Sequence, residues 1–208
     1  NVLALQIDSE FHKRIGKSDN NFSLLLPPKD SDLVNNNVKD PYIFEFISLN
    51  NNYKEQELEN KMVSKIRDVL LELGKGFSFV GNQYKISVDN QDFYIDLLFY
   101  HLELRCYIVV ELKAGEFKPE YVGQIGFYVT AIDKLLKKEH DNSTLGLLLC
   151  REKNRVTVDW SLQSSNVPIG VSTYKLNNKL PKNILDKLPT EEEINLHIDI
   201  ESGGSNEW

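Results

Sequence analysis

The stretch FYIDLLFYHLELRCYIVVELK, residues 93–113, predicts two neighbouring β-strands joined by a short turn. Two runs rich in aromatic and β-branched residues, 93–100 and 106–113, flank a more polar break. Asp96 lies inside the first run, and Glu111 and Lys113 lie at the end of the second. Positions i and i+2 of a strand share a face, so Glu111 and Lys113 point the same way. Charges at the edge of a core are costly to desolvate unless they are paired or bind a metal, so these three residues are functional candidates.

The turn between the two runs brings Asp96 towards the level of Glu111 or Leu112 on the neighbouring strand. Two adjacent carboxylates repel each other unless a cation lies between them. Mg²⁺ suits such a pair, because it needs only one or two protein carboxylates and completes its shell with water and substrate phosphate. The ammonium of Lys113 could orient or activate the attacking water. The three residues therefore indicate metal-assisted hydrolysis of a phosphodiester.

The rest of the chain alternates between helical and strand patterns. Apolar residues at helical spacing predict a helix of about five turns over residues 54–74, ended by Gly74. A strand over residues 77–88 would complete an antiparallel meander with the two quoted runs. Further expected elements are a helix or strand at 42–50, a helix at 120–140, and strands at 146–150, 156–160 and 169–176. This order predicts an α/β sandwich with a central mixed sheet.

Composition and charge narrow the class of protein. The 208 residues are 41% hydrophobic and 26% charged, which is typical of a globular chain. The net charge of −7 argues against nucleic-acid binding by bulk attraction alone, so a nucleic-acid site would need locally placed cations. Cys106 and Cys150 lack metal-ligand spacing and are expected to be free buried thiols, which is consistent with a reducing cytoplasm. No apolar stretch approaches the ~20 residues of a membrane span, so no membrane partner is expected.

The two ends of the chain differ from its middle. Residues 1–40 are rich in Asn, Asp, Ser and Pro, and predict an extended arm or interdomain connector. Residues 41–200 carry the patterned elements, and a terminal helical pair is expected at 180–198. Residues 201–208 predict a disordered tail. The start at Asn1 suggests a fragment of a longer protein.

The spacing of Asp96, Glu111 and Lys113, in a helix–meander–helix–strand context, resembles the YhcG-type branch of the PD-(D/E)xK nuclease superfamily. The resemblance covers roughly residues 20–198 and includes KDPYIFEF (39–46), LLELGKGFSFVGNQYKI (70–86), the run 93–128, GLLLC (146–150) and PIGVSTYKL (168–176). It implies a restriction-endonuclease-like fold with an αβββαβ core. The implied activity is Mg²⁺-dependent endonucleolytic cleavage of DNA, with Mn²⁺ able to substitute. It also implies a preceding N-terminal DNA-binding domain, of which residues 1–40 would be the connector.

The resemblance also implies roles for particular residues. Asp96 and Glu111 would be metal ligands, and Lys113 the catalytic lysine. Glu59 would be the acidic residue that such nucleases often supply from the first helix, with Glu57 a poorer match. The superfamily proline before the Asp is replaced here by Ile95, which leaves the ligand assignment intact.

Two further pairs match motifs of the same family. Gln124 and Tyr128 match its Gln-x-x-x-Tyr motif and would hold the substrate strand or order the active-site shell. Gln83 and Tyr84 resemble a second signature, for which a structural role is an equal alternative.

Two other readings stay open. The chain could be a catalytically silent DNA-binding or oligomerisation module, because a retained fold does not guarantee turnover. Alternatively, Glu111 and Lys113 could form an ordinary strand-end salt bridge, with Asp96 accepting a backbone hydrogen bond. Self-association is expected if two active sites are paired to cut two strands.

Overall fold

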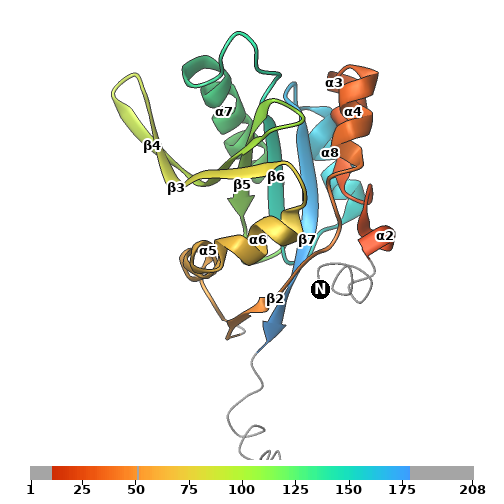
Figure 1. Cartoon of the computed structure of the whole chain (residues 1–208), viewed down its shortest axis with the longest axis vertical. Helices are drawn as coiled ribbons and strands as arrows, with labels where there is room; N and C mark the ends of the chain where they lie inside the picture. Colours follow the sequence, from red (N-terminus) through yellow and green to blue (C-terminus); the bar gives the residue numbers. More distant parts are fainter. Residues whose placement is uncertain (1–10, 51, 179–208) are drawn as a thin grey trace, which may run out of the picture. The chain divides into compact units, whose positions relative to one another are not determined.

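A computed structural model of the chain describes residues 11–50 and 52–178, which are built around one mixed β-sheet (Figure 1). The sheet has seven strands in the order β1-β7-β6-β5-β4-β3, and β2 pairs with β7 beside this path. The strands are β1 (Asp19–Asn20), β2 (Tyr42–Leu49), β3 (Phe77–Val88), β4 (Gln91–His101), β5 (Cys106–Leu112), β6 (Leu145–Cys150) and β7 (Ile169–Asn178). The central mixed sheet predicted from the sequence is confirmed.

Residues 93–113 lie in β4 and β5, which form an antiparallel meander with β3. β3 pairs with β4 and β4 with β5, as expected for a meander. The β3–β4 hairpin extends away from the other strands at the left of Figure 1. β5, β6 and β7 are mutually parallel. Parallel neighbours need crossover connections, and helices α7 (Glu120–Leu135) and α8 (Arg155–Gln163) supply them.

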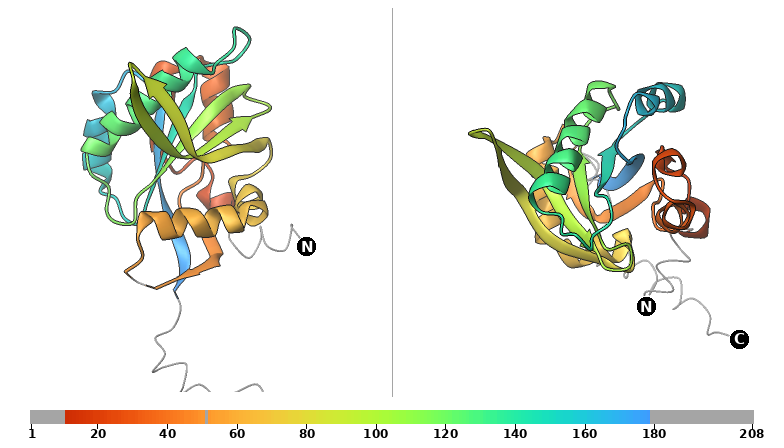
Figure 2. Two further views of the ribbon diagram at one scale, coloured as in Figure 1. Left: turned by 90° about the vertical axis from the view of Figure 1, so that its left-hand side faces the viewer. Right: turned by 90° about the horizontal axis from the view of Figure 1, so that it is seen from above.

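Helices cover both faces of the sheet. On one face, α5 (Glu55–Ser64) and α6 (Ile66–Leu73) share a core with β2 and the inward side chains of the sheet. On the other face, α7 and α8 pack over a second core. Seen from above in Figure 2 (right), α7 and α8 lie on one side of β5–β7 and β2 lies on the other. β5 shows the expected alternation, because Ile108 and Val110 enter the first core and Val109 enters the second.

The segment before residue 41 differs from the expected extended arm. Residues 11–40 form α2 (Phe11–Arg14), β1, α3 (Phe22–Leu25) and α4 (Pro28–Asn35). The Asn21 side chain accepts a hydrogen bond from the Ile169 N–H at 2.8 Å and donates to the Val167 carbonyl at 3.0 Å. The Asn and Asp residues that suggested an irregular segment are therefore used as tertiary hydrogen-bonding groups. The domain limits at residues 40 and 200 stay predictions.

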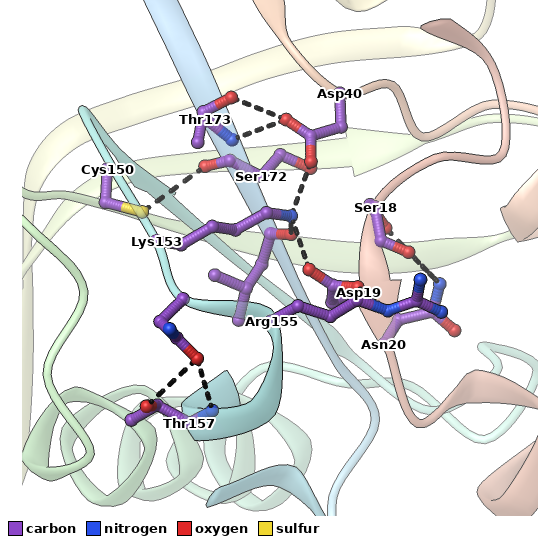
Figure 3. Close-up of polar contacts among 12 residues, drawn as sticks. Ser18, Asp19, Asn20, Asp40, Cys150, Lys153, Arg155, Thr157, Ser172 and Thr173 are labelled. Atoms are coloured by element: carbon purple, nitrogen blue, oxygen red, sulfur yellow. Dashed lines mark hydrogen bonds and ion pairs between the residues drawn. The ribbon is translucent and has the colours of Figure 1, made fainter. Parts of the chain in front are cut away.

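A cluster of ion pairs fastens this N-terminal segment to the sheet (Figure 3). Lys153 Nζ lies 2.9 Å from Asp19 Oδ2, pairs closely with Asp40, and donates to the Val171 carbonyl at 2.8 Å. Asp40 also accepts from the backbone N–H and the hydroxyl of Thr173, at 2.8 and 2.6 Å. We call Asp19, Asp40, Lys153, Arg155 and Thr173 the Lys153 cluster.

Two other elements differ from expectation. Residues 156–160, expected to be a strand, belong to helix α8, because the Asn154 side chain caps its N-terminus by accepting from the Thr157 N–H at 3.2 Å. The helix expected over residues 54–74 is broken at Lys65 into α5 and α6, where Lys65 has ψ +29°. The Ser64 hydroxyl donates to the Lys61 carbonyl at 2.8 Å, a local contact that competes with the helical pattern.

The remaining sequence expectations are simpler to place. Residues 42–50 form a strand, β2, and Cys106 and Cys150 are free and buried. Burial raises the pKa of each of these two thiols to about 12. Within the described ranges, no helix combines the length and the apolar character that crossing a membrane requires. The terminal helical pair and the tail at 201–208 lie outside the described residues.

Candidate active site

The pairing of β4 with β5 brings Asp96 beside the end of β5. The ladder runs from His101↔Cys106 to Leu97↔Val110, so Asp96 lies one step beyond its last pair. The Leu112 N–H donates to Asp96 Oδ2 at 2.9 Å. The register predicted from the sequence is therefore confirmed: Asp96 lies at the level of Glu111 and Leu112.

Lys113 follows β5 directly, and its backbone and side chain are both held. Its N–H donates to the Leu149 carbonyl at 2.8 Å, and its carbonyl accepts from the Tyr174 hydroxyl at 3.0 Å. Its Nζ lies 3.4 Å from Glu111 Oε2 and 5.0 Å from the centre of the Tyr121 ring. Since Glu111 and Lys113 are only 2% and 7% exposed, their charges interact in a largely dry environment.

Helix α5 contributes the acidic residue expected from the first helix. Glu59 is 2% exposed, whereas the poorer candidate Glu57 is exposed. Glu59 Oε1 accepts from the Asn82 side chain at 3.0 Å, and its Oε2 accepts from Gln83 Nε2 at 2.5 Å. Gln83 Nε2 also lies 3.4 Å from Asp96 Oδ1. A single amide group thus connects Glu59 to Asp96.

Sequence reasoning missed a fourth carboxylate, Glu55. Its Oε2 lies 3.7 Å from Lys113 Nζ, and its Oε1 accepts from the Ala114 N–H at 3.3 Å. A signal was present, because Glu55 precedes Glu59 by four residues and so lies on the same face of the helix.

Burial and mutual repulsion perturb the ionisation of this group. Burial first, and then the charge of Asp96, raise the pKa of Glu111. Burial likewise raises the pKa of Asp96, although the Leu112 N–H opposes the shift. Burial favours the neutral amine of Lys113, but the surrounding carboxylates, led by Glu111, outweigh it and raise its pKa. Lys113 is therefore a stable ammonium, and the carboxylates attract further positive charge.

The donor set fits a hard divalent cation. Glu111 Oε1 is buried and has no hydrogen-bond partner in the part of the chain that the structure describes. Leaving a buried carboxylate oxygen unpaired is costly, and a cation beside Asp96 would satisfy it. No three His, Cys, Asp or Glu residues within 11–50 and 52–178 form a ready-made metal site. A cation here would therefore need water or substrate oxygens as well, a pattern that suits Mg²⁺.

The expected motif on α7 is less closely connected. Gln124 Nε2 donates to the Tyr128 hydroxyl at 3.4 Å, so these two residues contact each other. Tyr128 is 7% exposed and packs in the second core, whereas Gln124 is exposed. Tyr121, about one turn before Gln124, is the α7 residue whose ring lies near Lys113. The face of α7 that carries Gln124 thus lies near the site, and the roles of Gln124 and Tyr128 stay predictions.

Comparisons with known proteins find a matching family model and a curated relative. The family model described as the YhcG PDDEXK nuclease domain matches residues 35–189. "Putative nuclease YhcG" of Escherichia coli (strain K12) is 31% identical over 189 residues, covering 89% of this chain and 50% of the relative. The chain thus spans about half the length of that relative.

Two solved structures show a more distant likeness. A repair endonuclease from Pyrococcus abyssi is 15% identical with a TM-score of 0.41, over 60% of this chain and 47% of that chain. An EndoMS–dsDNA2 complex is 14% identical with a TM-score of 0.42, over 65% of this chain and 48% of that chain. These scores are too low to carry an argument about this chain.

Proposed function

The chain belongs to the YhcG PDDEXK nuclease domain family, and from that premise we propose that it is a DNA endonuclease domain dependent on a divalent metal ion. Mg²⁺ is the proposed ion, with Mn²⁺ able to substitute. The observation that carries the proposal is the buried Glu111 Oε1, which lies beside Asp96 and Lys113 and has no hydrogen-bond partner among the residues that the structure describes. This is an arrangement of charge that a cation and a phosphodiester would complete.

We assign Asp96 and Glu111 as the metal ligands. Their carboxylates come from neighbouring strands, Glu111 is 2% exposed, and Asp96 is half-buried. Glu59 would support Asp96 from α5 through the shared Gln83 amide. When bound, a divalent cation supplies Lewis-acid polarisation of the phosphodiester and favours formation of the attacking hydroxide.

Lys113 would act as a fixed positive charge. The neighbouring carboxylates raise the pKa of its ammonium, so it enters the reaction protonated. Its Nζ can donate hydrogen bonds to the attacking water or to a phosphate oxygen as negative charge develops there. The backbone contacts with Leu149 and Tyr174 hold the residue at the end of β5. Gln124, exposed on α7 near the site, would contact the substrate strand, and Tyr128 would orient it.

The test is cleavage of linear duplex, single-stranded and branched DNA with Mg²⁺, with Mn²⁺ and with EDTA. We expect metal-dependent cutting by the wild type that both Asp96→Ala and Lys113→Ala abolish with folding intact. The matched controls are Asp92→Ala and Lys85→Ala, which alter an exposed ion pair on the same hairpin, 2.7 Å between Nζ and Oδ2, and should leave cutting unchanged.

Other outcomes would contradict the proposal. DNA binding by the wild type without cleavage of any substrate would favour the silent binding module. Cutting that survives both substitutions would show that the assigned site is wrong. A homo-oligomer that pairs two such sites is part of the proposal, and size measurement in solution with and without DNA tests it.

A further inference from the structure

Beside the candidate site, one side of strand β4 changes the core against which it packs. Leu97 and Phe99 of β4 pack in the core that includes α5 and α6, whereas Ile95 packs in the core that includes α7. In a regular strand residues 95, 97 and 99 would share one face. Near the base of the hairpin, this side of β4 therefore faces α5 and α6. Nearer the tip, the same side faces α7.

The change occurs at Gln83 and Asp96. The ladder pairs Asn82 with Leu97 and Tyr84 with Ile95, and the two residues between them, Gln83 and Asp96, are not a ladder pair. Gln83 has a φ of +42°, a left-handed backbone that residues other than glycine rarely adopt. Such conformations persist only where surrounding contacts enforce them, and they concentrate at functional sites.

The left-handed residue changes what two neighbouring side chains can reach. In a regular strand Asn82 and Gln83 would point to opposite faces. Here both amides contact Glu59, Asn82 at Oε1 and Gln83 at Oε2, at 3.0 and 2.5 Å. The Gln83 amide also lies 3.4 Å from Asp96 Oδ1. A donor between two carboxylates offsets their repulsion and sets their separation.

We propose that Gln83 is a positioning residue for divalent-metal binding, whose left-handed backbone and side-chain amide together hold Glu59 of α5 against Asp96 of β4. The inference rests on the proposed function, because it assumes that Asp96 is a metal ligand. Gln83 acts through the two carboxylates rather than on the reacting atoms. Groups that orient metal ligands in this way typically change metal affinity by about 10–100-fold when removed.

A glycine substitution separates the two contributions of Gln83. Gln83→Gly keeps the left-handed backbone, which glycine adopts readily, and removes the amide. The matched control is Asp89→Gly, since Asp89 is an exposed residue with φ +47° at the tip of the same hairpin. Gln83→Asn is a second variant, because asparagine tolerates this backbone but its amide is one methylene shorter.

The experiment measures melting temperature during titration with Mn²⁺, and separately the Mn²⁺ concentration that gives half-maximal cleavage. We expect Gln83→Gly and Gln83→Asn to fold without metal, yet to need about tenfold more Mn²⁺ than wild type in both measurements. Asp89→Gly should match the wild type.

Two results would overturn the inference, and they are distinguishable. If the wild type responds to Mn²⁺ and both Gln83 variants respond at the same concentrations, Gln83 has no positioning role and the metal site stands. If Mn²⁺ does not raise the melting temperature of the wild type at all, the proposed metal site fails, and the role of Gln83 fails with it.

Discussion

Among the described residues, the Lys153 cluster and the candidate site each place a partly buried lysine beside carboxylates, and they differ in how their charges are balanced. In the Lys153 cluster, Lys153 and Arg155 balance Asp19 and Asp40, and Thr173 supplies two further donors to Asp40 (Figure 3). At the candidate site the ammonium of Lys113 lies beside Glu111 and Glu55. Glu59 and Asp96, which share the Gln83 amide, bring the group to four carboxylates.

The contacts of the lysine are also shorter in the Lys153 cluster than at the candidate site. Lys153 lies within 2.9 Å of its Asp19 and Val171 partners, whereas Lys113 lies 3.4 and 3.7 Å from Glu111 and Glu55. Within residues 11–50 and 52–178, one carboxylate oxygen of Glu111 also has no hydrogen-bond partner. A satisfied cluster stabilises the fold, and a negatively charged, incompletely paired cluster is suited to receiving a ligand. The number of donors and the balance of charge, rather than the buried lysine itself, therefore distinguish a structural cluster from one that can receive a ligand.

The largest expected effect is on catalysis at the unbalanced cluster. Asp96→Asn should lower the cleavage rate at least about 10³-fold, since charge stabilisation by a metal amounts to several kcal/mol and 1.4 kcal/mol is tenfold. The asparagine is isosteric and can still accept from the Leu112 N–H, so the fold should remain. Asp40→Asn, the same change in the Lys153 cluster, should leave cleavage unchanged under conditions in which the variant stays folded. Equal losses of cleavage in the two variants would remove the distinction.

The second expected effect is on stability at the balanced cluster. Lys153→Met should lower the free energy of unfolding by about 3 kcal/mol, because it leaves two partly buried aspartates without their shared partner. Urea unfolding followed by circular dichroism measures the loss. Lys134→Met, an exposed lysine in the last turn of α7, is the control and should change stability little. A loss no greater than that of the control would mean that the Lys153 cluster is not a structural clamp.

The third prediction is a change in the free energy of unfolding that has opposite signs in the two clusters. Glu111→Gln should raise the free energy of unfolding in EDTA by about 1 kcal/mol, because it removes a buried like-charge repulsion beside Asp96. It should also abolish the rise in melting temperature that Mg²⁺ or Mn²⁺ gives the wild type. Asp19→Asn should instead lower stability and leave the metal response intact. A Glu111→Gln variant that is less stable in EDTA than wild type would show that its charge is already compensated.

The smallest effect concerns a buried neutral group away from both clusters. His101 is 0% exposed, and its Nδ1 accepts from the Leu104 N–H at 3.2 Å. Burial lowers the pKa of this imidazole, only partly opposed by the charge of Glu103. The unfolded chain therefore binds its proton more readily. The stability that neutral His101 contributes is present above pH 6.5 and is lost as pH falls through the folded pKa.

The variant His101→Phe removes the imidazole and so isolates its contribution to the pH dependence of stability. The difference in unfolding free energy between pH 7.5 and pH 5 should be smaller than in the wild type by about 1 kcal/mol. His140→Gln is the control, because His140 is exposed, and it should retain the wild-type pH dependence. An unchanged pH dependence in His101→Phe would mean that the buried imidazole is protonated equally well in both states.

Local pattern predicted the parts of the fold in which sequence neighbours determine the contacts. The meander, helix α7 and strands β6 and β7 follow from periodicity, and the register that brings Asp96 to Glu111 follows from the length of one turn. Residues 156–160 read as a strand because Val156 and Val158 alternate with polar residues, and the cap at Asn154 was overlooked. The N-terminal helices were missed because their polar side chains bond to strands far away in the sequence.

In the candidate site too, some residues could be predicted from the sequence and others could not. Asp96, Glu111 and Lys113 could be proposed from spacing, and Glu59 from its place on the first helix of the pattern. The contacts of Gln83 depend on a left-handed backbone that nothing in its neighbours demands, so they could not be predicted. The roles of all these residues stay predictions until the variants are measured.

The attachment of the N-terminal segment to β7 has a consequence for how the chain folds. Asn21 bonds to Ile169 across 148 positions, and Asp40 bonds to Thr173 across 133. Contacts of such long sequence separation slow folding, because the entropy of closing the loop must be overcome before the contacts form. During synthesis, α3 and the Lys153 cluster lack their partners until β7 has left the ribosome. The meander from β3 to β5, whose strands are joined by short turns, can form before then, and β6 and β7 are added beside β5 later.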